Sequence, residues 1–194
     1  RNNGKGKFEN VKDWLGRSRF DNPSVVRPGM IKDACWTDLN NDQLPDLVVV
    51  GEWMPITVLI QQKDHKFLNA TSDYGLAKTH GWWNSIEAAD FNKDGKPDFV
   101  VGNLGLNSRI RVSKDKPLMM YLGDFDSNGG SDHIMVYYNG DKRYPFASRD
   151  QLVKQIPMFK KKFPSYGAYQ NVELEDIITP LQQGNSASMK VTEF

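Results

Sequence analysis

The sequence has few of the residues that build the common catalytic and metal centres. Its 194 residues include one cysteine, Cys35, and three histidines, so neither a disulfide framework nor a zinc site of the Cys/His type is expected. We expect Cys35 to be a small buried residue in a strand. The sequence also lacks a G-x-S-x-G elbow and a phosphate-cradling loop. These absences argue against an enzyme whose active site can be recognised from a motif.

Charge and hydropathy argue against two further classes. The 25 Lys and Arg residues nearly balance the 24 Asp and Glu residues, and a net charge of +1 is not typical of a nucleic-acid-binding domain. No apolar run approaches the roughly 20 residues of a membrane-spanning helix. We interpret the basic run at residues 160–162 as the solvated face of a helix. The hydrophobic fraction of 39% instead fits a globular fold with a sizeable core.

What the sequence does contain is an acidic loop that occurs three times. Oxygen-bearing side chains stand at positions 1, 3, 5 and 9 of each copy, and a strand-like apolar run follows at once. The copies are "DLNNDQLPD" at residues 38–46, "DFNKDGKPD" at 90–98 and "DFDSNGGSD" at 124–132, here called the first, second and third acidic loops. Asp, Asn and Gly are ordinary turn residues, but three copies in register indicate more than a turn.

Side-chain oxygens at this spacing, together with one backbone carbonyl, form the ligand set that calcium prefers. We predict up to three calcium ions, each bound by the side chains at positions 1, 3, 5 and 9 and by the carbonyl at position 7. The predicted ligands are Asp38, Asn40, Asp42, Leu44 and Asp46; Asp90, Asn92, Asp94, Lys96 and Asp98; and Asp124, Asp126, Asn128, Gly130 and Asp132.

The residue at position 6 differs between the first loop and the other two. Gly95 and Gly129 permit a sharp turn there, whereas the first loop has Gln43, so we expect its site to be strained or weaker. An EF-hand is excluded because position 12 lies in a strand-like run and is not glutamate in any copy.

The loops also set the period of an internal repeat. Their first residues, Asp38, Asp90 and Asp124, are 52 and 34 residues apart. Strands are expected at 31–37, 47–52, 56–61 and 66–71, which together predict a four-stranded antiparallel unit of the kind that forms a β-propeller blade. The shorter second interval predicts an abbreviated outer hairpin at residues 109–114.

Residues 148–178 have helical signals instead. Ser148 and Gln151 form a capping-box pattern, Pro157 can open a second helix that ends before Pro164, and Glu173 with Glu175 marks the first turn of a third. We therefore expect an all-β fold of about three blades with a helical insertion. The predicted divisions are the tail of a preceding blade and a linker (1–30), three loop-bearing blades (31–80, 81–118 and 119–147), the helical insertion (148–180) and the start of a further strand (181–194).

The loops, together with "NNGKGKF", "DLVVVGEW" and "DFVVGNLG", resemble the FG-GAP/VCBS repeat family. The segments "GWWNSIEAADFNKDGKPDFVVGNLGLNS" and "YPFASRDQLVKQIPMFKKKFPSY" are similar to bacterial VCBS-repeat proteins of the ASPIC/UnbV-associated type. The resemblance implies an integrin-α-like, calcium-stabilised propeller of seven blades in an exported or cell-surface protein. We expect this chain to be a fragment, whose remaining blades come from the full-length chain or from a partner copy.

Three functions follow as hypotheses. The first is a non-catalytic calcium-binding module that recognises an unidentified protein or glycan, with no nucleic-acid partner and no membrane span in this chain. The second is a carbohydrate-binding propeller that stacks sugars on tryptophan and bonds them with amides, the candidates being Trp82, Trp83, Asn84, Asn103 and Asn107. The third is a propeller enzyme whose active site is assembled from separate blades and cannot be read from sequence.

Overall fold

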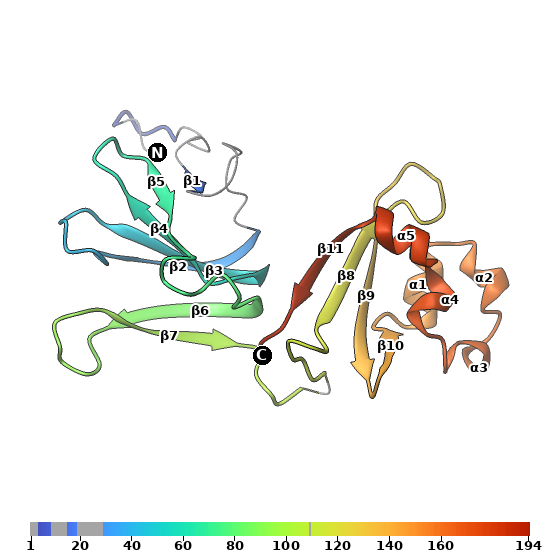
Figure 1. Cartoon of the computed structure of the whole chain (residues 1–194). Coiled ribbons are helices and arrows are strands. Elements are labelled where there is room, and N and C mark those ends of the chain that lie inside the picture. Colours follow the sequence, from blue (N-terminus) through green and yellow to red (C-terminus); the bar gives the residue numbers. More distant parts are fainter. Residues whose placement is uncertain (1–3, 9–14, 19–28, 109) are drawn as a thin grey trace. The chain divides into compact units, whose positions relative to one another are not determined.

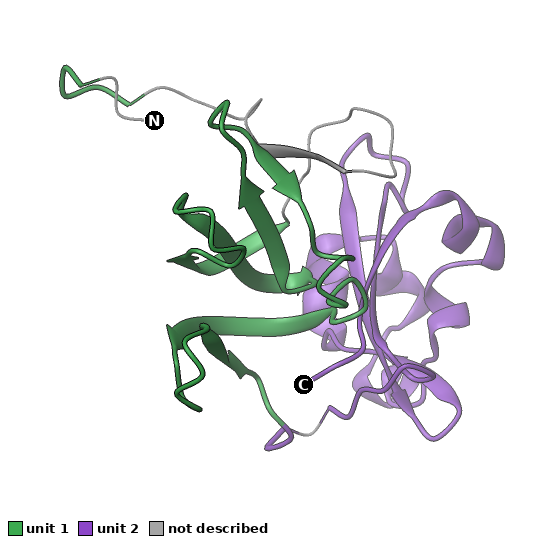
Figure 2. Ribbon diagram, turned by 60° about the vertical axis from the view of Figure 1, so that its left-hand side comes forward, with its two compact units in different colours: residues 1–105 green, residues 106–194 purple. Residues whose placement is uncertain are grey.

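A computed structural model describes residues 4–8, 15–18, 29–108 and 110–194. Most of the expected blade tail at the N-terminus lies outside these residues. The chain is mostly β, with two sheets and a short helical C-terminal region. It divides into two compact units, residues 1–105 and 106–194, which are coloured separately in Figure 2. Each unit is described by itself below.

The first unit is built on four consecutive antiparallel strands (Figure 1). These are β2 (Met30–Thr37), β3 (Asp46–Met54), β4 (Thr57–Gln61) and β5 (Phe67–Asn69), which pair in the order of the sequence. All four predicted strands are therefore confirmed, although the last is shorter than expected. Strand β1 (Leu15–Ser18) adds a parallel pairing beside β5.

A hairpin of two longer strands completes this unit. Strands β6 (Gly81–Ala89) and β7 (Asp98–Asn103) flank the second acidic loop, and the start of β6 also pairs with the end of β3. The Ile86 N–H donates to Asp33 Oδ2 at 3.0 Å, which links β6 to β2 through a side chain. The core of the unit comprises Val48, Val50, Val58, Ile60, Ala70, Trp83 and Ile86.

Cys35 corrects one expectation. It lies in β2 as a free thiol, but it is half-buried rather than buried. The reason is the place of β2 in the sheet. Among the described residues β2 pairs only with β3, so most of its side chains remain partly or fully exposed.

The prediction of a hairpin at residues 109–114 is wrong, as far as the structure describes this segment. No strand occurs in 104–108 or 110–117. Instead, the Arg111 guanidinium donates to the carbonyls of Leu106 and Ser108, and the Ser113 N–H donates to the Lys116 carbonyl at 3.1 Å. Because backbone groups must find partners, these local bonds replace those that a neighbouring strand would supply.

The second unit contains an antiparallel sheet in the order β10-β9-β8-β11. Its strands are β8 (Leu118–Gly123), β9 (Asp132–Asn139), β10 (Lys142–Pro145) and β11 (Ala187–Val191). Strands β8 and β9 flank the third acidic loop, as predicted. The strand expected near the C-terminus is β11, and it pairs with β8 along its whole length.

Five short helices pack beside this sheet (Figure 1): α1 (Arg149–Gln155), α2 (Phe159–Lys162), α3 (Tyr166–Tyr169), α4 (Leu174–Ile177) and α5 (Pro180–Asn185). The predicted capping box is present, since the Ser148 and Gln151 side chains bond each other's backbone N–H. Helices α1, α2 and α4 were predicted from the sequence, whereas α3 and α5 were not. Helix α2 begins two residues after Pro157, because Pro157 and Met158 form a turn.

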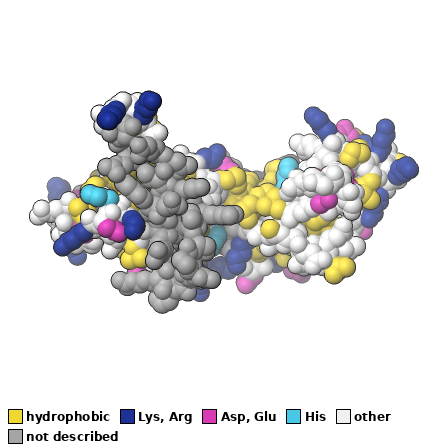
Figure 3. Space-filling view, turned by 90° about the horizontal axis from the view of Figure 1, so that it is seen from above, with side chains coloured by type: hydrophobic (Ala, Val, Ile, Leu, Met, Phe, Trp, Pro, Cys, Tyr) yellow, Lys and Arg dark blue, Asp and Glu magenta, His cyan; other side chains and the backbone are white. Residues whose placement is uncertain are grey.

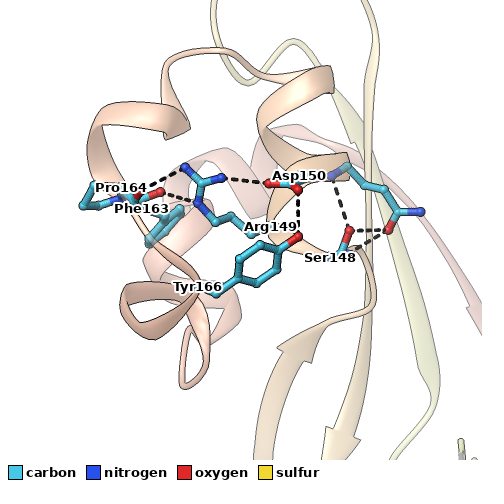
Figure 4. Close-up of polar contacts among 7 residues, drawn as sticks. Ser148, Arg149, Asp150, Phe163, Pro164 and Tyr166 are labelled. Carbon is cyan, nitrogen blue, oxygen red and sulfur yellow. Dashed lines mark hydrogen bonds and ion pairs between the residues drawn. The ribbon is translucent and has the colours of Figure 1, made fainter.

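A polar network holds the first three helices together (Figure 4). The Arg149 Nε and Nη2 atoms donate to the carbonyls of Phe163 (2.7 Å) and Pro164 (3.2 Å), beyond the end of α2. Asp150 accepts from Arg149 Nη1 at 2.8 Å and from the Tyr166 hydroxyl at 2.7 Å. Helix α1 thereby fixes both α2 and α3.

The apolar side of these helices and one face of the sheet form a continuous core. It comprises Tyr121, Phe125, Ile134, Val136, Leu152, Ile156, Phe159, Phe163, Val172, Leu174, Ile177 and Ile178. Residues 160–162 are exposed, as expected of a solvated helix face, and Figure 3 shows Lys and Arg side chains gathered around the helical end of this unit.

Candidate metal centre

The three acidic loops share one backbone conformation. Positions 4 and 6 of each loop have a positive φ, in the left-handed region that most L-residues avoid. The φ values are 59° at Asn41 and 68° at Gln43, 63° at Lys93 and 82° at Gly95, and 62° at Ser127 and 82° at Gly129. The positive φ at position 6 explains why the second and third loops have glycine there. The left-handed residues at position 4 were not predicted, because none of them is glycine.

The carboxylate at position 1 closes the turn in every loop. Asp38, Asp90 and Asp124 each accept hydrogen bonds from the backbone N–H groups at positions 5 and 6, over distances of 2.8 to 3.2 Å. The Gly129 N–H makes the largest contribution to lowering the pKa of Asp124 below its ordinary value. In the third loop these hydrogen bonds therefore favour the charged form of Asp124.

The carboxylate at position 9 joins the end of each loop to its beginning. Asp46, Asp98 and Asp132 accept from the backbone N–H at position 2, at 2.9, 3.0 and 3.1 Å respectively. Asp46 and Asp132 are buried, with exposed fractions of 0% and 5%, whereas Asp98 is half-buried. A buried carboxylate is costly unless it is paired, so these bonds offset the cost of burying Asp46 and Asp132.

Asp46 has a second role that the others lack. Its Oδ1 atom accepts from the Gln61 N–H at 2.8 Å, at the end of β4, while Oδ2 accepts from Leu39. The first acidic loop is thereby bonded to the outer hairpin of its own sheet. From the sequence, Asp46 was predicted only as a metal ligand.

The third loop brings its carboxylates closest together. One oxygen each of Asp124, Asp126 and Asp132 lies within 4.8 Å of the others, the only group of three acidic, histidine or cysteine ligands that meets this limit among the described residues. A divalent cation bound among these oxygens would offset their repulsion. The residues of the third loop thus fit a calcium ion.

In the first and second loops an amide occupies position 3. The Asn40 Nδ2 donates to Asp42 at 2.9 Å, and the Asn92 Nδ2 donates to Asp94 at 3.2 Å. Each amide oxygen accepts from the backbone N–H at position 5. The backbone N–H at position 7, in Leu44, Lys96 and Gly130, donates to the side chain at position 5. The role of the position-7 carbonyls as ligands stays a prediction.

The residues proposed for carbohydrate binding have other contacts in the structure. Trp83 belongs to the core, and its Nε1 donates to the Thr79 carbonyl at 2.8 Å. The Trp82 ring meets the Trp53 ring edge-on, with centroids 5.6 Å apart.

The amides of that set lie at exposed or partly exposed positions. Asn84 bonds the Trp82 carbonyl at 3.4 Å, and Asn103, which pairs with Trp83 across the β6–β7 hairpin, accepts from Leu104 at 2.7 Å. Asn107 is exposed and belongs to the second unit. A sugar site at these residues remains a prediction.

Comparison with known families gives a match over part of the chain. Residues 38–101 match the model of the FG-GAP-like repeat, a span that contains the first and second acidic loops, strands β3 to β6 and the first part of β7. No curated protein and no solved structure matches the chain. Among the described residues, none of the helices has both the length and the apolar character needed to cross a membrane.

Proposed function

We propose that the chain is part of a calcium-stabilised β-propeller, on the premise that residues 38–101 match the model of the FG-GAP-like repeat. Its function is recognition of a protein or glycan in an exported or cell-surface protein, without catalysis. FG-GAP repeats typically bind calcium and typically occur in extracellular proteins, which supports both parts of the proposal. The remaining blades come from the full-length chain or from a partner copy.

The observation that carries the calcium proposal is the geometry of the third loop. Three carboxylates lie within 4.8 Å of one another on a backbone that has the same left-handed positions as both loops in the matched repeat. Six to eight oxygen ligands in a flexible arrangement suit calcium better than magnesium, which demands a strict octahedron. Water would complete each shell beyond the predicted protein ligands.

A bound ion would act on the sheets through the strand ends. Each loop joins two antiparallel strands, so an ion held by positions 1 and 9 fixes both strands at their shared end. At a calcium concentration a hundredfold above the dissociation constant, one site contributes about 2.7 kcal/mol. Three such sites would be comparable with the whole stability of a typical domain, about 5–15 kcal/mol.

The test is calcium titration and thermal unfolding of the chelator-stripped chain. We expect up to three bound ions and a rise in melting temperature that magnesium does not reproduce. Asp124→Asn should remove one ion, whereas Asp115→Asn, a change at an exposed acid outside the loops, should remove none. A stripped chain that binds no calcium and melts identically with and without it would contradict the proposal.

A further inference from the structure

An open groove in the second unit is lined by none of the acidic-loop residues and by none of the residues in the proposed tryptophan set. Its volume is about 510 Å³. It forms where the strandless segment 110–116 meets the far end of β9 and the turn before β10. The lining residues are Ile110, Arg111, Val112, Ser113, Lys116, Tyr137, Tyr138, Asn139 and Gly140.

The lining of the groove is suited to an anion. Two of its side chains are cationic, Arg111 and Lys116, and none is a carboxylate. Two tyrosines, a serine and an asparagine add aromatic surface and hydrogen-bonding groups. Small-molecule sites are typically lined by apolar and aromatic side chains together with a few polar groups that orient the ligand.

Both cations can engage a ligand. The Arg111 Nη1 is held by the carbonyls of Leu106 and Ser108, which orients the guanidinium and leaves Nε and Nη2 without a hydrogen bond among the described residues. Lys116 forms an ion pair of 2.7 Å with Asp141, whose side chain is 95% exposed. This bond lowers the pKa of Asp141. An exposed pair of this kind contributes little stability, so a bound anion can replace Asp141 as the partner of Lys116.

We propose that this groove binds a small anionic sugar, a sugar acid or a sugar phosphate. Its carboxylate or phosphate accepts hydrogen bonds from Lys116 and Arg111, and its hydroxyl groups bond Ser113 and Asn139. The proposal rests on the recognition function proposed above and names a ligand class for it. The predicted calcium ligands lie outside the groove.

The test is calorimetry on the full chain in calcium, with glucuronate, glucose 6-phosphate and neutral glucose as probes. We expect at least one of the two acids to bind at least tenfold more tightly than glucose. Glucuronate alone would identify a sugar acid as the ligand type, and glucose 6-phosphate alone a sugar phosphate. Equal binding of glucose, or no binding by either acid, would overturn the proposal.

Two substitutions at the ion pair sharpen the test, because they act in opposite directions. Lys116→Gln should weaken binding about tenfold, the usual effect of losing one charge-assisted hydrogen bond. Asp141→Asn should strengthen binding several-fold, because it removes the competing carboxylate. Lys154→Gln, an exposed lysine on α1, is the matched control and should change nothing.

Unchanged binding in Lys116→Gln, or weaker binding in Asp141→Asn, would contradict the assignment. Calcium stoichiometry, measured on the same samples, is expected to remain that of the unaltered chain. That second readout shows that each variant is folded. It also separates a failure of the groove from a failure of the calcium proposal.

Discussion

The first and third acidic loops have the same backbone turn but different attachments. In the first, Asp46 is fully buried and bonds both its own loop and β4, while Gln43 holds a left-handed φ of 68°. In the third, Gly129 occupies that position, and Asp132 bonds Phe125 in the loop. The third loop gathers three carboxylates within 4.8 Å.

The repeated sequence pattern suggests that all the loops have the same role, but this difference shows two separate roles. A loop can connect its sheet through the buried position-9 carboxylate, and it can concentrate negative charge through positions 1, 3 and 9. The first loop is specialised for the former and the third for the latter. Substitutions at matching positions should therefore have unequal effects.

The largest expected difference in stability between loops comes from substitutions at position 9. Asp46→Ala would leave the partly buried N–H groups of Leu39 and Gln61 without this acceptor, and we expect a loss of about 2–5 kcal/mol in the free energy of unfolding. The matched change Asp98→Ala removes bonds within an exposed loop, where water can substitute, and should cost about 1 kcal/mol. Urea unfolding in chelator measures both. Equal losses would show that the bond to β4 contributes nothing.

Substitutions at position 6 are expected to change the free energy of unfolding by a smaller amount. Gly129→Ala places a Cβ in open space but at a left-handed φ, so strain alone should lower the free energy of unfolding by about 1 kcal/mol. Gln43→Gly should raise it by about 0.5 kcal/mol, because relief of strain exceeds the added chain entropy.

Gln43→Ala is the control for this pair, since it removes the side chain but keeps the strained backbone. It should leave the stability unchanged in the same urea experiment. A gain from Gln43→Ala as large as that from Gln43→Gly would show that the side chain, and not φ, is responsible.

The smallest effect concerns position 3, where the two loops carry different residues. Asn40→Asp adds a fourth carboxylate to the first loop, and Asp126→Asn removes one from the third. Without calcium and at low salt, we expect the first change to destabilise and the second to stabilise by about 0.5 kcal/mol each. Both differences should shrink in 0.5 M NaCl. Shifts of the same sign in the two variants would mean that charge repulsion does not distinguish the loops.

Local patterns predicted much of this fold, and contacts between distant residues explain what they missed. Apolar runs beside the acidic loops predicted strands β3, β7 and β9, and the Ser148 capping box predicted α1. Helix α5 also has a capping box, with Thr179 at the N-cap and Pro180 first in the helix, so a signal for it was present. The absence of a strand at 110–117 could not be predicted, since it depends on where the Arg111 guanidinium binds.

The candidate site was predictable to a similar extent. The spacing identified the oxygen-bearing residues, because it repeats three times in the sequence. It could not show that Asp46 reaches Gln61, or that the third loop gathers its carboxylates most closely. Both depend on backbone dihedral angles and on strand pairing, which residue identity alone does not determine.

The shortness of the helices has a spectroscopic consequence. The longest, α1, has seven residues and three others have four, well below the roughly 12–15 residues that an isolated helix needs in water. They exist because Phe159, Leu174 and Ile177 pack into the core beside the sheet. The helical circular dichroism signal of this unit at 222 nm should therefore be lost on unfolding. The tyrosine fluorescence should change in the same single transition. Its helical signal thus serves as an optical reporter of whether the neighbouring sheet is assembled.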